Sequence, residues 1–256
     1  MKEPLSVTKR RLWARLGLAK QRYQQGLFVA EGEKVCETLL QEYLPHAWLA
    51  EESAEPLHQR FQRLTPQVPL YTAPLSVLKE VSQLEAVRPI VGLFQIPTEA
   101  PPPVPTNITV GLDAIQDPGN LGTIIRLCDW LGVGPVLCGN GCADLYNPKV
   151  VQATAGALSP AKVFPKVDLQ QYIHEHNPLV LGTKMEGESI YQLKTIPRAT
   201  PLLVLLGNEG RGLSPHLHPL CQHWLSVPGA HNRRAESLNV GISAAIILSH
   251  LKGFSL

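Results

Sequence analysis

Strand-like and helix-like segments alternate along most of the chain, as judged from its apolar and polar positions. In the first part, short apolar runs such as LFVA, AWLA and PIVGLFQI alternate with segments of helical periodicity, including EGEKVCETLLQEY. We expect a basic helix over about residues 6–20 and further helices over 54–63 and 75–83. This alternation predicts a small α/β domain.

The second part carries stronger strand signals. ITVGLD, LVLGT and PLLVLLG are apolar almost throughout, which is typical of strands covered on both faces in a parallel sheet. Helices are expected over 121–131, near 148–157 and from Glu236 to about His250. The last of them is apolar almost all round, so it should pack inside the domain or against another subunit.

A proline-rich segment separates the two parts. Five prolines lie within nine residues of IPTEAPPPVPTN, and proline removes backbone donors and favours extended conformations. We therefore assign a first domain to residues 1–96, a linker to 97–107 and a second domain to 108–256.

Composition narrows the class of protein. An apolar content of 44% in 256 residues can supply a real core. No signal-peptide-like apolar region is present, and no stretch of about 18 residues is both free of charge and apolar throughout, so we expect a cytoplasmic protein without membrane spans. The five cysteines show no CxxC spacing and should be reduced. Cys138 and Cys142 have no matching pair for a zinc site, so no metal is expected.

Positive charge gathers near the N-terminus, although the formal net charge is only +2. In the first 22 residues a single acid, Glu3, faces seven basic side chains. Such a cluster attracts a polyanion such as RNA, while a solvated helix face is the plainer interpretation. The basic residues are Lys2, Lys9, Arg10, Arg11, Arg15, Lys20 and Arg22.

The segment DAIQDPGNLGTIIRLCDWLG follows the first strong strand of the second domain. Asp117, Pro118 and Gly119 predict a turn, and Asn120 is a good N-cap for the helix that carries Arg126. Burying an unpaired guanidinium in this apolar helix would be costly. We therefore expect an anionic partner, either an internal carboxylate or a phosphate.

Two further polar loops follow strands. LLGNEGRG ends its strand at Gly207, where open α/β sheets place ligands, but it is neither a Walker loop nor a GxGxxG fingerprint. A tight turn and a ligand loop therefore remain open. In SVPGAHNRRAESLNVGISAA, the polar residues Glu236, Ser237 and Asn239 lie at the expected helix start, where they could hold a ligand or simply cap the helix.

In this order, DPGNLGTIIR, LLGNEGRG and VP…ESLNVGISAAI resemble the three motifs of the SpoU branch of SPOUT RNA methyltransferases. The upstream KQRYQQGLFVAEGEKVCETLL resembles the N-terminal substrate-binding domain of that branch, which has a ribosomal-protein-like α/β fold. The resemblance implies a C-terminal parallel-sheet domain with a deep trefoil knot, an exception to unknotted folding. It also implies a homodimer that transfers a methyl group from S-adenosylmethionine to a ribose 2'-hydroxyl of structured RNA.

Carried over residue by residue, the resemblance implies two sets of site residues. The glycines let backbone close around the cofactor, and Glu209 orders the loop or the site. The implied cofactor contacts are Leu206, Gly207, Gly210, Val227 and Leu238. The implied catalytic positions are Asn120, Arg126, Glu209, Ser237 and Asn239.

The family role proposed for the arginine at Arg126 is that of general base. A guanidinium pKa above about 12 argues against simple deprotonation. We instead expect Arg126 to grip a substrate phosphate and polarise the hydroxyl, with that phosphate available to take the proton.

The chain departs from the family pattern in two places. It has Gly241 where members often carry Ser, and the loop from Pro228 to Ser237 is longer than usual. Arg233 and Arg234 in this loop are candidate RNA contacts, together with Arg10, Arg11, Arg15 and Arg22.

The expected substrate is 23S ribosomal RNA, because the N-terminal segment resembles domains used on large-subunit RNA. A transfer RNA 2'-O-methyltransferase is the main alternative, and a non-catalytic knotted RNA-binding protein is another. The intact polar positions disfavour the non-catalytic protein. An unrelated nucleotide-binding enzyme is disfavoured because no Walker loop or GxGxxG is present.

Overall fold

Two compact units make up the chain in the computed structural model, which describes residues 2–193 and 200–254. Unit 1 comprises Met1–Thr98 and Asp144–Ser159, and unit 2 comprises Glu99–Ala143 and Pro160–Leu256. Each unit has its own β-sheet.

Unit 1 is built on a five-stranded mixed sheet in the order β1-β4-β3-β5-β2. β5 runs antiparallel to both of its neighbours, whereas β1, β3 and β4 pair in parallel. The strands are β1 (Lys2–Pro4), β2 (Leu27–Glu31), β3 (Pro45–Glu51), β4 (Leu70–Ala73) and β5 (Ile90–Gln95).

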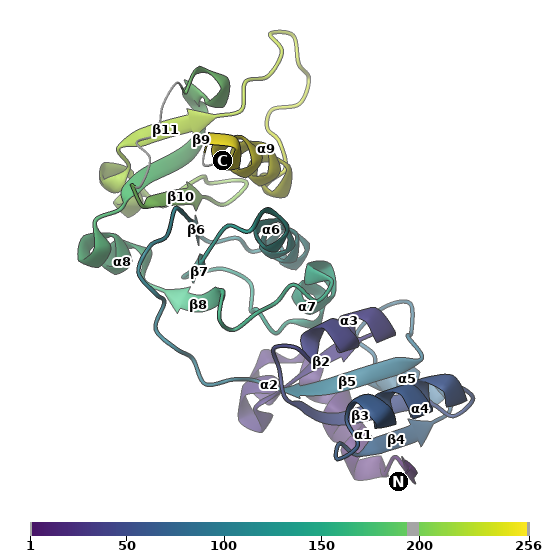
Figure 1. Ribbon diagram of the computed structural model, residues 1–256. Helices are drawn as coiled ribbons and strands as arrows, with labels where there is room; N and C mark the ends of the chain where they lie inside the picture. The colour runs from purple at the N-terminus through teal and green to yellow at the C-terminus, as the bar shows by residue number, and fades with distance from the viewer. Residues whose placement is uncertain (1, 194–199, 255–256) are drawn as a thin grey trace. The chain divides into compact units, whose positions relative to one another are not determined.

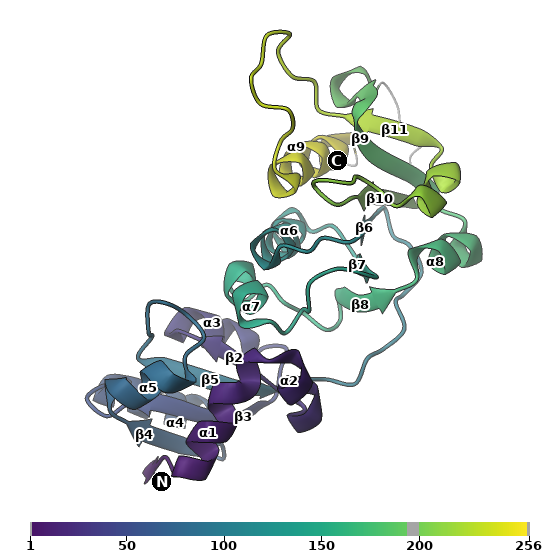
Figure 2. The ribbon, with the colours of Figure 1, turned by 180° about the vertical axis from the view of Figure 1, so that it is seen from behind.

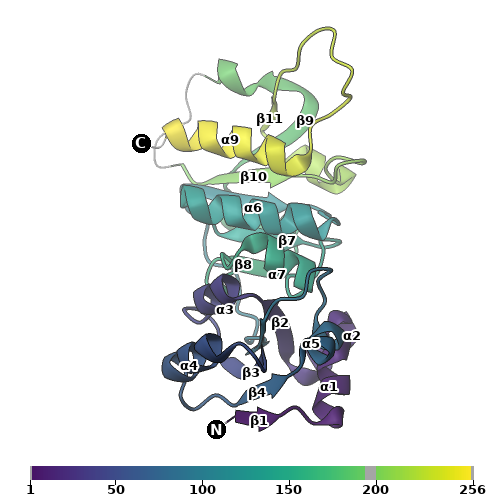
Figure 3. The same cartoon turned by 90° about the vertical axis from the view of Figure 1, so that its right-hand side faces the viewer.

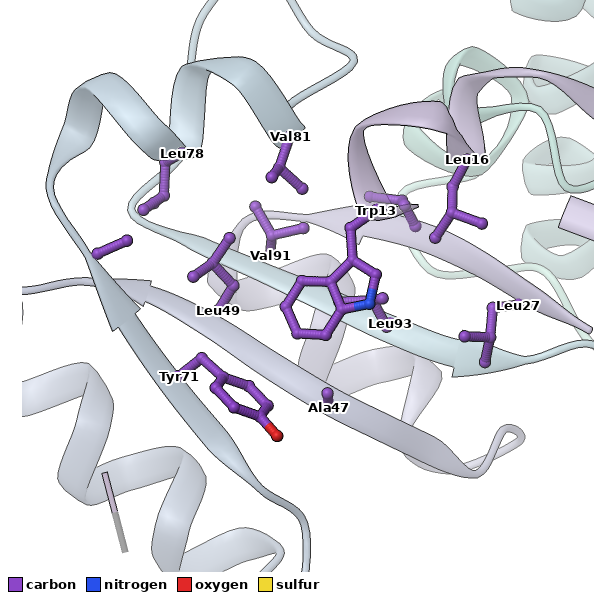
Figure 4. Close-up of a cluster of buried hydrophobic side chains, with 12 residues drawn as sticks. Trp13, Leu16, Leu27, Ala47, Leu49, Tyr71, Leu78, Val81, Val91 and Leu93 are labelled. Carbon is purple, nitrogen blue, oxygen red and sulfur yellow. The ribbon is translucent and has the colours of Figure 1, made fainter. Parts of the chain in front are cut away.

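Helices cover both faces of this sheet (Figures 1 and 2). On one face Trp13 and Leu78 pack with strand residues such as Leu49 and Val91 (Figure 4). The opposite face is aromatic, and the ring of Trp48 lies 4.6 Å from that of Phe61, centroid to centroid. The helices are α1 (Val7–Ala14), η1 (Arg15–Gly17), α2 (Ala19–Gln25), α3 (Glu33–Leu39), α4 (Glu55–Leu64), α5 (Leu75–Val81) and α7 (Pro148–Thr154).

The segment 144–159 packs with unit 1, although the sequence assigned it to the second domain. The ring of Tyr146 lies 5.0 Å from that of Phe28, and the Ser159 hydroxyl donates to the Glu42 carboxylate at 3.0 Å. These contacts join residues more than a hundred positions apart, so local periodicity could not reveal them.

Arg22 is an internal residue of unit 1, and the expectation that it contacts RNA is wrong. Its side chain is 1% exposed and pairs with Asp144. It also donates to the carbonyl oxygens of Leu16 and Gly17 at 2.8 and 2.7 Å. A buried guanidinium needs such partners, and its two terminal nitrogens find them within the protein, while its Nε has no hydrogen-bond partner among the described residues.

Unit 2 contains a six-stranded sheet in the order β11-β9-β10-β6-β7-β8. All of its pairings are parallel, which confirms the expected α/β fold with a parallel sheet. The strands are β6 (Ile108–Leu112), β7 (Val136–Gly139), β8 (Val163–Val167), β9 (Leu179–Ser189), β10 (Leu202–Leu206) and β11 (His223–Ser226).

β10 lies inside this sheet, and all five of its residues are buried. Leu203 and Leu205 pack with α8 (Leu169–His176) and η3 (Pro215–Leu220). The other face is covered by α6 (Pro118–Leu131) and α9 (Val240–Phe254), which lie side by side (Figure 3). A further 3-10 turn, η2, spans Ile190–Gln192. No helix within the described residues has the length and apolar character needed to cross a bilayer.

Two helices of unit 2 begin elsewhere than expected. α6 starts at Pro118, and its N-cap is Asp117, whose carboxylate accepts from the Asn120 backbone N–H at 2.7 Å. Proline suits the first helical position because its missing N–H has no partner there. α9 starts at Val240, after Asn239, so Ser237 lies outside the helix and does not cap it.

Candidate active site

The carboxyl ends of β6 and β10 bring two of the polar loops together. The strands are parallel neighbours, and Leu206 pairs with Leu112. The Asp113 N–H donates to the Leu206 carbonyl oxygen at 2.9 Å, and the Asp113 carboxylate accepts from the Ser214 N–H at 2.6 Å. Asp113 is 5% exposed, so this contact fixes both loops at a buried point.

The loop 207–213 is a tight turn held by Asn208. The Asn208 side chain accepts from the N–H groups of Gly210 and Arg211 at 3.0 and 3.2 Å and donates to the Ala114 carbonyl oxygen at 2.9 Å. Backbone hydrogen bonds between Asn208 and Gly212 close the turn at 2.8 and 3.0 Å. Neither Asn208 nor Asp113 was predicted from the sequence, although an asparagine between glycines is a signal for an Asx turn.

Two glycines of this loop meet different constraints. A Cβ on Gly207 would lie 2.4 Å from the Gly212 carbonyl carbon and 2.5 Å from the Leu213 nitrogen, so only glycine fits. The nearest atom to a Cβ on Gly210 would be 3.7 Å away. Gly210 lies at the exposed tip with Glu209. The loop is therefore a structural turn that presents its tip to solvent.

Three predicted catalytic residues form one chain of hydrogen bonds. The Asn120 amide nitrogen donates to the Glu209 carboxylate, and the Asn120 amide oxygen accepts from Asn239 at 2.8 Å. The Asn239 amide oxygen accepts from the N–H groups of Gly241 and Ile242 at 2.9 and 3.3 Å, at the start of α9. Each residue comes from a different motif, so tertiary folding brings all three motifs to one place.

This series of hydrogen bonds fixes the direction in which each side-chain amide points. Backbone N–H groups are donors only, so they oblige the amide oxygen of Asn239 to face α9. Its nitrogen then faces Asn120, whose own nitrogen is left to donate to Glu209. An exposed carboxylate is thereby oriented by a helix terminus of the same unit.

Arg126 lies outside this bonded set. It is exposed on α6, and no ion pair of its guanidinium is found among the described residues. The expected internal carboxylate partner is therefore not observed in the part of the chain that the structure describes. An exposed guanidinium stays hydrated and needs no internal carboxylate. Arg126 is therefore accessible to an anionic group of a ligand that binds from solvent.

The remaining predicted contacts differ in exposure. Leu206 is 1% exposed and packs in the core, so only its backbone could meet a ligand. Val227 is half-buried, whereas Leu238 is 47% exposed and Ser237 is also exposed. Arg233 and Arg234 are exposed in the same loop.

Of the predicted RNA contacts in unit 1, Arg11 and Arg15 are exposed. Arg10 is half-buried, and its Nε lies 3.3 Å from a Glu80 carboxylate oxygen. This ion pair partly neutralises the local charge of α1.

Cys142 lies beside the loop after β6. Its Sγ donates to the Leu112 carbonyl oxygen at 3.2 Å and accepts from the Ile115 N–H at 3.4 Å. Burial raises the pKa of this thiol to about 11, so the thiolate is not formed near neutral pH. Among the described residues, no group of three or more His, Cys, Asp or Glu side chains is arranged to hold a metal ion.

Comparison with known proteins identifies the family. The model of the SpoU rRNA Methylase family matches residues 107–249, which include all three motifs. The chain belongs to this family. It is 30% identical over 246 residues to the 23S rRNA (guanosine(2553)-2'-O)-methyltransferase RlmP of Bacillus subtilis, with 94% of each protein covered.

Solved structures of other proteins share the fold of this protein over nearly its whole length. A putative RNA methyltransferase of the TrmH family from Porphyromonas gingivalis is 33% identical, with a TM-score of 0.81 and coverage of 96% of this chain and 98% of that one. The SpoU methyltransferase AviRb from Streptomyces viridochromogenes, solved with AdoMet, has the same fold. Its TM-score is 0.83 at 24% identity, with 97% and 98% covered.

Proposed function

We propose that this SpoU family member transfers a methyl group from S-adenosylmethionine to a ribose 2'-hydroxyl of 23S ribosomal RNA. The observation that carries the proposal is the hydrogen-bonded set of Glu209, Asn120 and Asn239, which joins the three family motifs at one edge of the sheet. RlmP, matched over 94% of its length, supports 23S RNA as the substrate class.

The loop 207–213 fits a cofactor bound through backbone. The loop's own backbone fills the space beside Gly207, but its tip at Gly210 is open, and Leu238 presents apolar surface beside Asn239. Gly207, Gly210, Val227 and Leu238 would hold the cofactor, with Leu206 contributing backbone only. When bound, S-adenosylmethionine supplies an electrophilic methyl group.

The protein must position the ribose hydroxyl and help it to lose its proton, because this hydroxyl is a poor nucleophile near pH 7. Arg126 grips the phosphate beside the target ribose and polarises the hydroxyl. The 2'-oxygen forms its bond to the methyl carbon as the sulfur–carbon bond breaks, and the hydroxyl proton passes to an oxygen of the gripped phosphate. Asn120 and Asn239 act as positioning residues through Glu209.

RNA contacts extend beyond the reacting ribose. Arg11 and Arg15 are exposed on the basic segment of unit 1, and Arg233 and Arg234 are exposed on the loop before α9. Arginine suits phosphate because its guanidinium donates two parallel hydrogen bonds. Unit 1 thus acts as an RNA-binding domain with a ribosomal-protein-like fold.

The apolar surface of α6 and α9 fits a homodimer. Trp130 is 87% exposed and Ile242 is 53% exposed, on two helices that pack against each other. Large exposed apolar side chains on adjacent helices are typical of a subunit interface.

The proposal has two further parts. The segment that leads from β11 to α9 is deeply knotted, and the protein is cytoplasmic.

Methyl transfer to separated RNA pools tests this function. Tritiated S-adenosylmethionine is incubated with unmodified 23S RNA, 16S RNA and transfer RNA, with the wild-type protein and with Arg126→Ala. Alkali-stable label in 23S RNA that is lost with Arg126→Ala is the expected result. Label in transfer RNA alone would show that transfer RNA, and not 23S RNA, is the substrate. Cofactor binding without methyl transfer to any RNA or ribosomal subunit would indicate a non-catalytic protein.

A further inference from the structure

A groove in unit 1, outside the candidate active site, has the chemistry of a nucleotide site. Its volume is about 620 Å3, within the range of about 300–1,000 Å3 that small-ligand sites occupy. Polar side chains from α1, α2, β3 and β5 surround an aromatic floor. The residues that define it are Lys9, Trp13, Gln25, His46, Tyr71 and Gln95.

The floor of the groove is rigid. Trp13 and Tyr71 are 2% and 6% exposed, and their rings meet edge to face at a centroid distance of 5.4 Å. Both belong to the packed cluster that contains Leu27 and Ala47, which also line the groove (Figure 4). A floor fixed by the core does not need to be ordered when a ligand binds.

Lys9 is held above this floor. Its ammonium nitrogen donates to the Tyr71 hydroxyl and lies 4.1 Å from the centre of the Tyr71 ring. An ammonium group has three N–H donors, so two remain for an anion such as a phosphate. None of the described residues that line the groove is acidic, so no carboxylate there competes for them.

Three exposed side chains at the rim can read a base. Gln25 ends α2, and Gln95 ends β5, where it pairs with Leu27. His46 lies where the register between β3 and β5 shifts, and such bulges redirect side chains. Amides donate and accept along a base edge, and an imidazole ring stacks on its face.

We propose that this groove holds one unstacked nucleotide of the RNA substrate, other than the nucleotide that is methylated. Lys9 contacts the phosphate, Gln25 and Gln95 contact the base edge, and His46 stacks on the base. The exposed Arg11 and Arg15 on the adjoining turns favour a nucleotide within a polyanion over a free one. The proposal rests on the proposed function in that the substrate is RNA.

The test compares two charge-neutral double variants, Gln25→Ala/Gln95→Ala in the groove and Gln24→Ala/Gln59→Ala on exposed positions outside it. Affinity for unmodified 23S RNA is measured by filter binding, and S-adenosylmethionine affinity by calorimetry. The groove variant should bind RNA about tenfold more weakly, because it loses about two hydrogen bonds to a base. The control variant and cofactor affinity should be unchanged. A parallel titration uses AMP, GMP, CMP and UMP.

The outcomes separate this proposal from the proposed function. Equal RNA affinity of the two double variants overturns the groove, even if methyl transfer is normal. Weakened RNA binding by the groove variant supports it, even if the wild type transfers no methyl group. If a free mononucleotide binds tightly and the groove variant keeps its RNA affinity, the groove is a site for a free nucleotide and the proposal is wrong. If the wild-type protein binds no RNA, both proposals are overturned.

Discussion

The Asn239 amide nitrogen lies 2.8 Å from the Asn120 amide oxygen, joining residues 119 positions apart. Because Asn239 also receives two backbone N–H groups of α9, its side chain cannot turn without losing those bonds. The orientation of Asn120, and through it of Glu209, therefore depends on how α9 begins.

Replacing Asn239 by Ser separates capping from positioning. Serine caps helices about as well as asparagine, but its short side chain cannot reach Asn120. We expect Asn239→Ser to keep its thermal midpoint and to lose methyl-transfer activity by about tenfold or more, because the orientation of Asn120 and Glu209 is no longer fixed. Asn239→Ala should lose similar activity and about 1 kcal/mol of stability as well. Unchanged turnover in Asn239→Ser would show that the hydrogen bonds linking Asn239, Asn120 and Glu209 have no role in catalysis.

Gly207→Ala and Gly210→Ala form a matched pair in one loop. The first places a methyl group 2.4 Å from backbone, so the loop must shift, whereas the second meets nothing closer than 3.7 Å. We expect Gly207→Ala to weaken S-adenosylmethionine binding at least tenfold by calorimetry and to lower the thermal midpoint. Gly210→Ala should keep its stability, and any loss of affinity in it would then report direct contact with the cofactor.

Arg126→Lys tests the guanidinium itself. Since Arg126 is exposed, its replacement should change the free energy of unfolding by no more than about 0.5 kcal/mol. Lysine cannot reproduce a two-point contact with phosphate, so kcat should fall by about a hundredfold or more. Rapid-quench turnover and denaturant unfolding measure the two quantities. Near-normal turnover of Arg126→Lys would show that the Arg126 guanidinium has no role in methyl transfer.

Arg22→Met tests a buried ion pair that resembles an RNA contact in sequence. Replacing Arg22 removes the donor to one Asp144 carboxylate oxygen and to two carbonyl oxygens, while the other Asp144 oxygen keeps its bonds from Tyr23 and Tyr146. We expect a loss of about 3 kcal/mol in denaturant unfolding, whereas Arg11→Met at an exposed position should change little. RNA affinity of the folded protein should fall for Arg11→Met and not for Arg22→Met. The opposite pattern would restore Arg22 as an RNA contact.

Trp130→Glu tests the proposed homodimer. A charge on the exposed face of α6 should convert dimers to monomers in sedimentation velocity without unfolding the protein, because the side chain is 87% exposed. Met185→Glu, at a 67% exposed position on β9, is the control and should stay dimeric. A wild-type protein that sediments as a monomer at micromolar concentration would refute the dimer.

The sequence by itself determined the features that depend on local pattern. The run LLVLL specified a strand buried on both faces, and the order of three polar motifs at strand ends identified the family and its candidate residues. These signals are legible because apolar periodicity and strand-end loops follow directly from neighbouring residues.

Only the tertiary structure decided which polar groups meet. Arg22 and Arg11 lie on one basic stretch, yet the first pairs with Asp144, 122 positions away, and the second faces solvent. In the same way, Asn120 proved to link Glu209 with Asn239 and not to cap its helix. Burial and long-range hydrogen bonding depend on where the chain returns in space, and residue spacing carries no record of that.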